Sequence, residues 1–255
     1  ASLGGSMVGV WAGDNGTTQN LYLRGLASNG VPQGATYTTL PLPSVNSFWQ
    51  SRPRLKASNT QYGLVWVDGT QPFFSRLSAA GALLDGTGRS IDTNCVKVDL
   101  ASDGTNFLVV WSPQSGGNVL ARRMSGTTGL TLDTTPITIS PYNAVAGSTQ
   151  NPAEPSVVFD GTNYIVTWGE TVDDAGLDIQ RRTVSPSGAL GAPELIAGGQ
   201  GDQQRPAIAL GAQGQIAHVW LEPDVGAGTL RVADLVSAVA AFDASVQLGD
   251  GGSAD

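Results

Sequence analysis

The 255-residue sequence is poor in the side chains on which many catalytic and metal sites depend, with one cysteine and one histidine. Cys95 therefore cannot form a disulfide within the chain, and zinc sites and Ser/His or Cys/His nucleophiles are close to excluded. Basic residues number 13 against 21 acidic ones, without a basic cluster, which argues against nucleic-acid binding. No apolar run approaches the roughly 20 residues that span a bilayer, so we expect no membrane insertion.

The residues that are abundant indicate short strands joined by turns. Glycine occurs 34 times, charged residues make up 13% of the chain, and the hydrophobic content of 40% suffices for a core. No signal peptide begins at Ala1, so the sequence alone allows a mature, a trimmed or a cytosolic chain. The composition, poor in lysine and rich in glycine, serine, threonine and asparagine, favours export from a bacterium.

An apolar stretch closed by tryptophan occurs five times, and the tryptophans are separated by 55, 45, 57 and 52 residues. The stretches are SMVGVW (6–11), QYGLVW (61–66), NFLVVW (106–111), NYIVTW (163–168) and QIAHVW (215–220). Self-similarity at such a period is typical of repeat architectures. We expect five repeats of about 50 residues within a single domain, at 1–48, 49–93, 94–150, 151–202 and 203–255.

Each repeat has the pattern of four short strands. In the fourth, the run Pro155–Phe159 is followed by Asp160-Gly161, a hairpin signal in which both turn residues take positive φ, and then by Tyr164–Trp168. This last run is apolar on both faces, as expected for a strand that is covered on both sides. Two further short strands follow. Five such units predict an all-β fold, a five-bladed β-propeller with four antiparallel strands per blade.

Two of the repeats carry a motif that is familiar. The segments DGTNFLVVW (103–111) and DGTNYIVTW (160–168), with DIQRRTVSPSGALGAP (178–193), resemble the tandem repeats of secreted bacterial β-propeller proteins, which are common in myxobacteria. The resemblance covers nearly the whole chain. It implies a secreted or cell-surface location and a non-catalytic role in binding or adhesion. We expect a monomer or part of a larger secreted chain, with five blades in one ring rather than a piece of a longer array.

An acidic residue follows four of the five tryptophans, and an arginine lies in the next strand. We expect solvated cross-strand ion pairs that contribute roughly 0.2–1 kcal/mol each. A ring of carboxylates that binds cations or sugar hydroxyls is the alternative. The acids are Asp14, Asp68, Glu170 and Glu222, and the arginines are Arg24, Arg76, Arg182 and Arg231.

The segment before the first strand of each repeat is the better candidate site, because these connections gather around the channel mouth of a propeller. Trp49 is the one tryptophan outside the repeated position, and its ring, beside amides and a guanidinium, suits the apolar face and hydroxyl rim of a sugar. Packing of Trp49 against a neighbouring blade is the alternative. The candidate residues for a carbohydrate or protein ligand are Trp49, Gln50, Arg52, Asn94, Lys97, Asn151, Glu154, Gln204 and Arg205.

Three further features have simpler explanations. His218 replaces the valine of other repeats, so we expect a buried, hydrogen-bonded imidazole. Cys95 lies in an apolar run and is expected to be an inert strand residue. Asp173, Asp174 and Asp178 could hold calcium, but they lack the spacing of an EF-hand loop, and we otherwise expect no cofactor.

The sequence thus favours a non-catalytic extracellular binding or adhesion module. Hydrolysis of a glycosidic bond needs two carboxyl groups at a fixed separation. Asp99 and Glu154 are the only acids at or next to the start of the predicted inner strands. A polysaccharide-cleaving hydrolase or lyase that uses this pair is the first alternative, and a structural spacer domain is the second.

Overall fold

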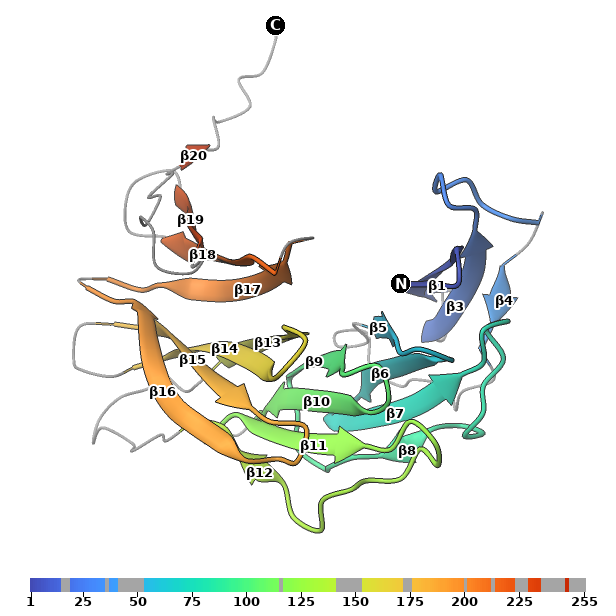
Figure 1. Ribbon diagram of the computed structural model, residues 1–255, viewed down its shortest axis with the longest axis horizontal. Helices are drawn as coiled ribbons and strands as arrows, with labels where there is room; N and C mark the ends of the chain where they lie inside the picture. Colours follow the sequence, from blue (N-terminus) through green and yellow to red (C-terminus); the bar gives the residue numbers. More distant parts are fainter. Residues whose placement is uncertain are drawn as a thin grey trace, which may run out of the picture. The chain divides into compact units, whose positions relative to one another are not determined.

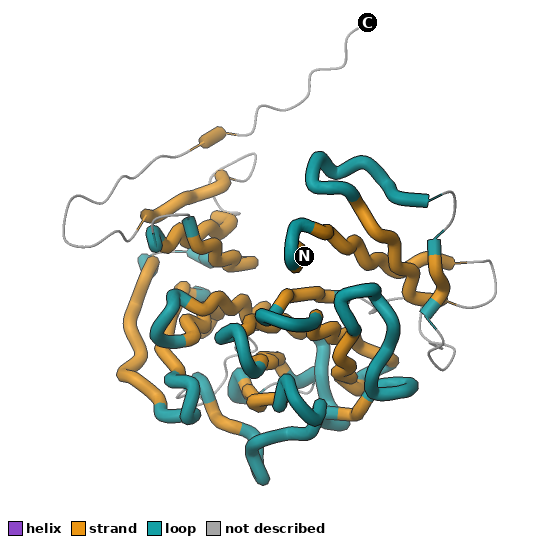
Figure 2. The backbone as a smooth tube through the Cα atoms, turned by 45° about the vertical axis from the view of Figure 1, so that its right-hand side comes forward, coloured by secondary structure: helices purple, strands orange, loops and turns teal. Residues whose placement is uncertain are grey.

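The structure, a computed structural model, consists of strands and connecting loops. It describes residues 1–14, 19–34, 37–40, 53–114, 117–140, 153–171, 176–199, 201–211, 214–222, 229–234 and 246–247. Figure 2 shows no helix in these segments, and so they contain none long and apolar enough to cross a membrane. The chain divides into two compact units, one of residues 1–115 and 120–137 and one of residues 116–119 and 138–255. Each unit is described by itself.

The first unit holds three four-stranded sheets. Thr138, the last residue of the third sheet, belongs to the second unit. In each sheet consecutive strands are neighbours, so the chain runs from one edge strand to the other (Figure 1). Sheet 1 comprises β1 (Ser2–Leu3), β2 (Ser6–Asp14), β3 (Gln19–Leu26) and β4 (Thr38–Thr39). Sheet 2 comprises β5 (Arg54–Ala57), β6 (Tyr62–Asp68), β7 (Gln71–Leu77) and β8 (Arg89–Ser90). Sheet 3 comprises β9 (Lys97–Ser102), β10 (Phe107–Ser112), β11 (Leu120–Met124) and β12 (Ile137–Thr138).

The second unit holds two sheets of the same kind. Sheet 4 comprises β13 (Ala153–Phe159), β14 (Tyr164–Glu170), β15 (Asp178–Val184) and β16 (Leu190–Ala197). Sheet 5 comprises β17 (Gln204–Leu210), β18 (Ile216–Glu222), β19 (Thr229–Asp234) and β20 (Val246–Gln247). One sheet therefore lies in each of the five expected repeats. Whether the five repeats form a single domain stays a prediction.

The second strand of each sheet carries the repeated tryptophan, and four of the five indoles are buried. Trp111 packs with Val65 and Phe74 of sheet 2, and Trp66 packs with Leu21 of sheet 1, so each lies between two sheets. All six residues of β10 and all seven of β14 are buried, as the apolar pattern predicts. Trp11 departs from the expectation, because it is 39% exposed. It belongs to the first sheet of its unit, and no other sheet precedes it there.

The repeated Asp-Gly pair forms a turn of a different kind from the one expected. Only the glycines, Gly104 and Gly161, take positive φ, at 93° and 102°. The aspartates instead act as acceptors within a longer turn, since Asp160 Oδ1 accepts hydrogen bonds from the amides of Thr162 and Asn163, each at 2.7 Å. Asp103 makes the same two bonds in sheet 3. The motif Asp-Gly-Thr-Asn is therefore explained by turn geometry.

Candidate functional site

The first strand of each sheet is called its inner strand below, and the second its middle strand. In sheets 2 and 3 the inner strands β5 and β9 carry charged side chains, whereas the middle strands β6 and β10 are buried. In the first unit, β5 alternates exposed and half-buried residues, whereas β6 is buried over its first six positions. Arg54 of β5 and Asp99 of β9 form an ion pair with Nε and Oδ1 3.8 Å apart, and their side chains are 48% and 13% exposed. The inner strands are thus the part of the sheets where a polar ligand would find charged partners.

The connections at the start of β9 meet those at the end of the middle strands, as the sequence predicts for one face of a propeller. Asn94 is half-buried, and its Oδ1 accepts a hydrogen bond from the amide of Gln114, 2.8 Å away, in the segment after β10. The hydroxyl of Thr70, between β6 and β7, donates to the carbonyl of Thr93 at 3.2 Å. Lys97 is half-buried and is the first residue of β9. These contacts hold the segment with Asn94 at the end of sheet 3 where Lys97 begins β9.

In the second unit, two predicted site residues have an unusual backbone. Glu154 and Arg205 are the second residues of the inner strands β13 and β17, and their φ angles are 54° and 53°. They are the only residues other than glycine with positive φ in the described segments. Each precedes a proline, and a residue in that position normally adopts an extended conformation. The positive φ is therefore strained at both positions.

The strain coincides with a break in strand pairing. The register of β13 on β14 shifts between Ala153 and Ser156, and that of β17 on β18 shifts between Gln204 and Ala207. Such bulges re-aim a side chain and are over-represented next to active sites. Glu154 is half-buried and Arg205 is exposed. The structure thus places a carboxylate and a guanidinium at equivalent positions of two inner strands, each at a local distortion.

The segment before β17 also contacts the connection between β14 and β15. Gln204 donates from Nε2 to Oδ2 of Asp202 at 2.9 Å, and Asp202 Oδ1 accepts from the amide of Leu177 at 3.0 Å. The amide of Gln203 donates to the carbonyl of Leu177 at 2.6 Å. Gln203 is buried, and its Oε1 has no hydrogen-bond partner in the described part of the chain. These polar groups line the same end of the second unit as Glu154 and Arg205.

Two of the acids that follow the tryptophans accept hydrogen bonds from the indoles. Trp168 Nε1 donates to Glu170 Oε2 at 2.7 Å, and Trp220 Nε1 donates to Glu222 Oε1 at 3.2 Å. Burial raises the pKa of Glu170, and the indole bond only partly opposes this. In sheet 3, where no acid follows, the buried Nε1 of Trp111 has no partner among the described residues. The shared contact in two sheets indicates a packing role for these carboxylates.

The expected cross-strand ion pairs are wrong where the side chains are described. Arg182 lies opposite Val166 in β14, and it donates to the carbonyls of Gly191 and Ile139, at 2.6 and 2.8 Å. Glu170 lies opposite Asp178 instead. The expectation failed because strand register, rather than order along the chain, decides which residues face each other. The side chains of Asp14 and Arg231 lie outside the described ones.

Half-buried arginine–aspartate pairs join the third strand to the turn that follows. Arg76 Nε and Nη2 donate to the two carboxylate oxygens of Asp85, each at 2.9 Å. Arg123 makes the same kind of contact with Asp133, whose Oδ1 lies 2.9 Å from Nε. Burial acts to raise the pKa of Asp85, but the hydrogen bonds and charge of Arg76 outweigh it and lower that pKa. Sequence reasoning missed both pairs.

His218 and Cys95 are both buried, and each differs in one respect from expectation. The expected burial of His218 is confirmed, but neither ring nitrogen has the expected hydrogen-bond partner within the described segments. Burial, followed by the charge of Arg181, lowers the pKa of His218 to about 4. Cys95 lies just before β9 rather than in a strand, and burial followed by the charge of Asp92 raises its pKa to about 12. An inert thiol is consistent with that burial.

Several predicted residues cannot be placed. Asp178 is described and buried at the start of β15, and no group of three or more His, Cys, Asp or Glu side chains in the described segments is arranged to hold a metal ion. The predicted residues that lie outside the described ones are Trp49, Gln50, Arg52, Asn151, Asp173 and Asp174. The calcium site therefore stays a prediction, as does the role of Trp49.

Comparisons with known proteins give no close relative. No protein-family model matches the sequence, and no curated protein matches it. Solved structures do resemble the chain in three dimensions. An endo-1,4-β-xylanase from Bacteroides thetaiotaomicron is 11% identical, with a TM-score of 0.52 and an alignment that covers 93% of this chain and 93% of that one.

Two further structures are similar over most of this chain. Hydrazine synthase from Kuenenia stuttgartiensis is 12% identical, with a TM-score of 0.58 and coverage of 92% of this chain and 64% of that one. An exo-β-1,3-galactanase from Phanerochaete chrysosporium is 12% identical, with a TM-score of 0.50 and coverage of 92% and 59%. The chain therefore spans less than two thirds of these two proteins. At such identities the likeness concerns the fold, which is all-β and matches the five-bladed β-propellers of glycoside hydrolases.

Proposed function

We propose that the protein acts on a polysaccharide, and that it cleaves a glycosidic bond at the end of the inner strands where β13 and β17 begin. The observation that carries the proposal is the strained, bulged backbone at Glu154 and Arg205. Strain of this kind clusters at active sites and ligand clamps, where the surrounding structure maintains it. A carboxylate and a guanidinium, held by neighbouring strands, are groups that hydrogen-bond sugar hydroxyls.

Cleavage requires a second carboxyl group besides Glu154. Glycosidases use one carboxyl group as the acid for the leaving oxygen and another as base or nucleophile. Glu154 is the one acidic residue of the inner strands β13 and β17 in the described part of the second unit. We assign Glu154 the proton transfer to the leaving oxygen.

The substrate class has separate support. The similar structures include a xylanase and a galactanase, and both enzymes act on polysaccharides according to their names. A polysaccharide substrate also fits a secreted or cell-surface location, which is part of the proposal. Fractionation of a producing culture tests that location, and recovery of the protein from the cytosol alone would contradict it.

The test is product analysis after incubation with xylan, arabinan and β-1,3-galactan. We expect the wild-type protein to release oligosaccharides from at least one of them. Glu154→Gln should lower the rate by a factor of about 10² or more. This variant should still bind the substrate. A polysaccharide that Glu154→Gln cleaves as fast as the wild type does would refute the assignment.

Non-catalytic binding is the second candidate function. It is favoured by the ion pair between Asp99 and Arg54, because these two side chains offer charged groups to a polar ligand on the inner strands of the first unit. Affinity electrophoresis through gels that contain each polysaccharide separates the two functions. Retardation without any cleavage would establish the binding module, and neither retardation nor cleavage would leave the structural spacer.

A further inference from the structure

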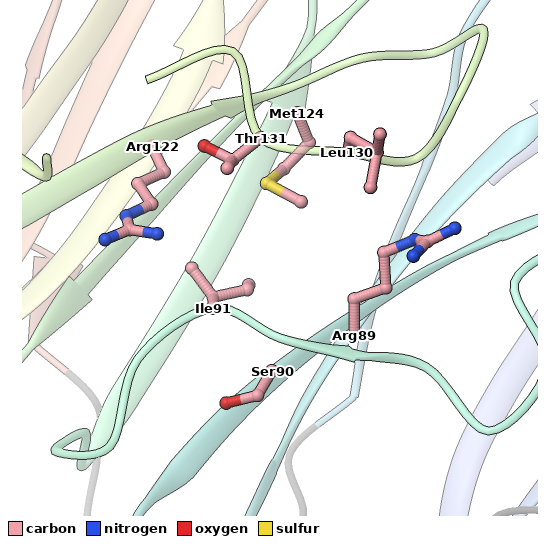
Figure 3. A pocket seen from close by; sticks show the side chains of 7 residues that line it. All are labelled: Arg89, Ser90, Ile91, Arg122, Met124, Leu130 and Thr131. Atoms are coloured by element: carbon pink, nitrogen blue, oxygen red, sulfur yellow. The ribbon is translucent and has the colours of Figure 1, made fainter. Parts of the chain in front are cut away.

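A pocket lies between sheets 2 and 3, away from the inner strands. Its volume is about 240 Å³, and β8, β11 and the segments that follow them line it. Figure 3 shows Arg122 on one side of this pocket and Arg89 on the other, with Ile91 and Met124 between them. Leu130, Ser90 and Thr131 complete the lining, which contains no acidic side chain. All seven residues belong to the first unit.

Arg122 is an arginine without a partner in the described part of the chain. Its side chain is half-buried, and its Nε is fully covered but makes no hydrogen bond. Its equivalent in sheet 4 is Arg182, since each lies opposite the residue two positions before the tryptophan. Arg182 donates to the carbonyls of Gly191 and Ile139. Arg122 therefore has N–H donors without acceptors among the described residues, whereas Arg182 at the equivalent position donates to two carbonyls.

Arg89 adds a second positive charge to the same pocket. Its Nη2 lies 3.5 Å from Asp85 Oδ1, while its Nε is covered and has no partner in the described segments. The carboxylate of Asp85 is already bound at 2.9 Å by Nε and Nη2 of Arg76, so it neutralises Arg89 only in part. In a protein of net charge −8, this pocket is a local concentration of positive charge.

We propose that this pocket binds a sugar acid, with the carboxylate on Arg122 and Arg89 as the second charge. A guanidinium pairs with a carboxylate through charge-assisted hydrogen bonds. The carboxylate would accept these bonds from the terminal nitrogens of Arg122, because its Nε is covered. Ile91, Met124 and Leu130 offer an apolar surface to the face of a ring, while Ser90 and Thr131 offer hydroxyls. The volume is below that of typical pockets for larger ligands, so a single ring fits better than an extended chain.

The site is independent of the proposed cleavage, because it does not use Glu154. Isothermal titration calorimetry with sodium glucuronate tests it, with neutral glucose and sodium sulfate as comparison ligands. We expect saturable binding of one glucuronate per chain and none of glucose. Arg122→Gln should weaken this binding about tenfold or more, because a charged hydrogen-bond donor is lost.

Two other variants complete the experiment. Arg24→Gln is the matched control, since Arg24 has the equivalent register in sheet 1 and lies outside the pocket, and it should bind glucuronate as the wild type does. Arg89→Gln should weaken binding about threefold through the loss of one charge. It tests the proposal even where Arg122→Gln fails to fold. Absence of glucuronate binding, binding unchanged in both pocket variants, or sulfate binding as tight as glucuronate binding would overturn the proposal.

Discussion

Replacing His218 by valine should remove an acid-sensitive group from the middle strand of sheet 5. The imidazole is fully buried, and neither nitrogen has a hydrogen-bond partner within the described segments. Burial first, and the charge of Arg181 second, lower its pKa from 6.5 to about 4. Valine occupies the same register position in sheets 3 and 4, as Val109 and Val166, so the side chain suits this environment.

The magnitude follows from proton linkage. In the unfolded chain the imidazole binds a proton near pH 6.5, whereas in the folded chain it does so only near pH 4. Because the unfolded state binds more protons between these values, the free energy of unfolding falls as the pH falls through that window. One pKa unit corresponds to about 1.4 kcal/mol, so the loss between pH 7.5 and 4.5 is about 2.5 kcal/mol.

Urea unfolding of the wild type and His218→Val at pH 7.5 and 4.5, followed by tryptophan fluorescence, measures this loss. Carboxylates contribute equally to both proteins, so the difference between the two pH dependences isolates the imidazole. The wild type should lose about 2.5 kcal/mol more than the variant. Val166→Ala is the control, since it should lower stability at both pH values without changing the pH dependence. Parallel pH dependences of the wild type and His218→Val would refute the reasoning.

Three further predictions concern other strained or buried groups. Glu154→Gly should raise the free energy of unfolding by about 0.5–1 kcal/mol, because glycine adopts positive φ without strain. The same variant should abolish polysaccharide cleavage. A lower free energy of unfolding in urea would contradict this prediction. Asp85→Asn should cost about 3 kcal/mol in thermal unfolding, because it leaves the guanidinium of Arg76 without its charged partner; an unchanged melting temperature would contradict it. Cys95 should react with a thiol reagent at pH 8 about a thousandfold faster in urea than in the native state, because its raised pKa keeps it protonated; equal rates would contradict this.

The fold was predictable because the middle strands carry a strong signal. Strands such as β14 are apolar on both faces and end in tryptophan, and burial on both sides is the physical reason for that pattern. The spacing of the tryptophans then implied one sheet per repeat. Trp11 shows the limit of this inference, because a position in the repeat does not say whether a neighbouring sheet covers it.

The candidate site was less predictable, because its features depend on tertiary context. Glu154 and Arg205 were predicted from their place before a strand. Their positive φ could not be predicted from the sequence, because a residue before proline prefers an extended conformation. The pair of Arg76 and Asp85 did have a signal in the sequence. Asp85 follows Arg76 by 9 residues, and Asp133 follows Arg123 by 10 residues in the next repeat. The imidazole of His218, which has no hydrogen-bond partner among the described residues, had no such signal.

The central claim is that carbohydrate is recognised where β13 and β17 begin. Affinity electrophoresis of the wild type, Arg205→Gln and Arg24→Gln in gels containing xylan, arabinan or β-1,3-galactan tests it most directly. The account predicts that at least one polysaccharide retards the wild type and Arg24→Gln, and that Arg205→Gln migrates with little or no retardation. Equal retardation of all three proteins, or none in any gel, would contradict the claim.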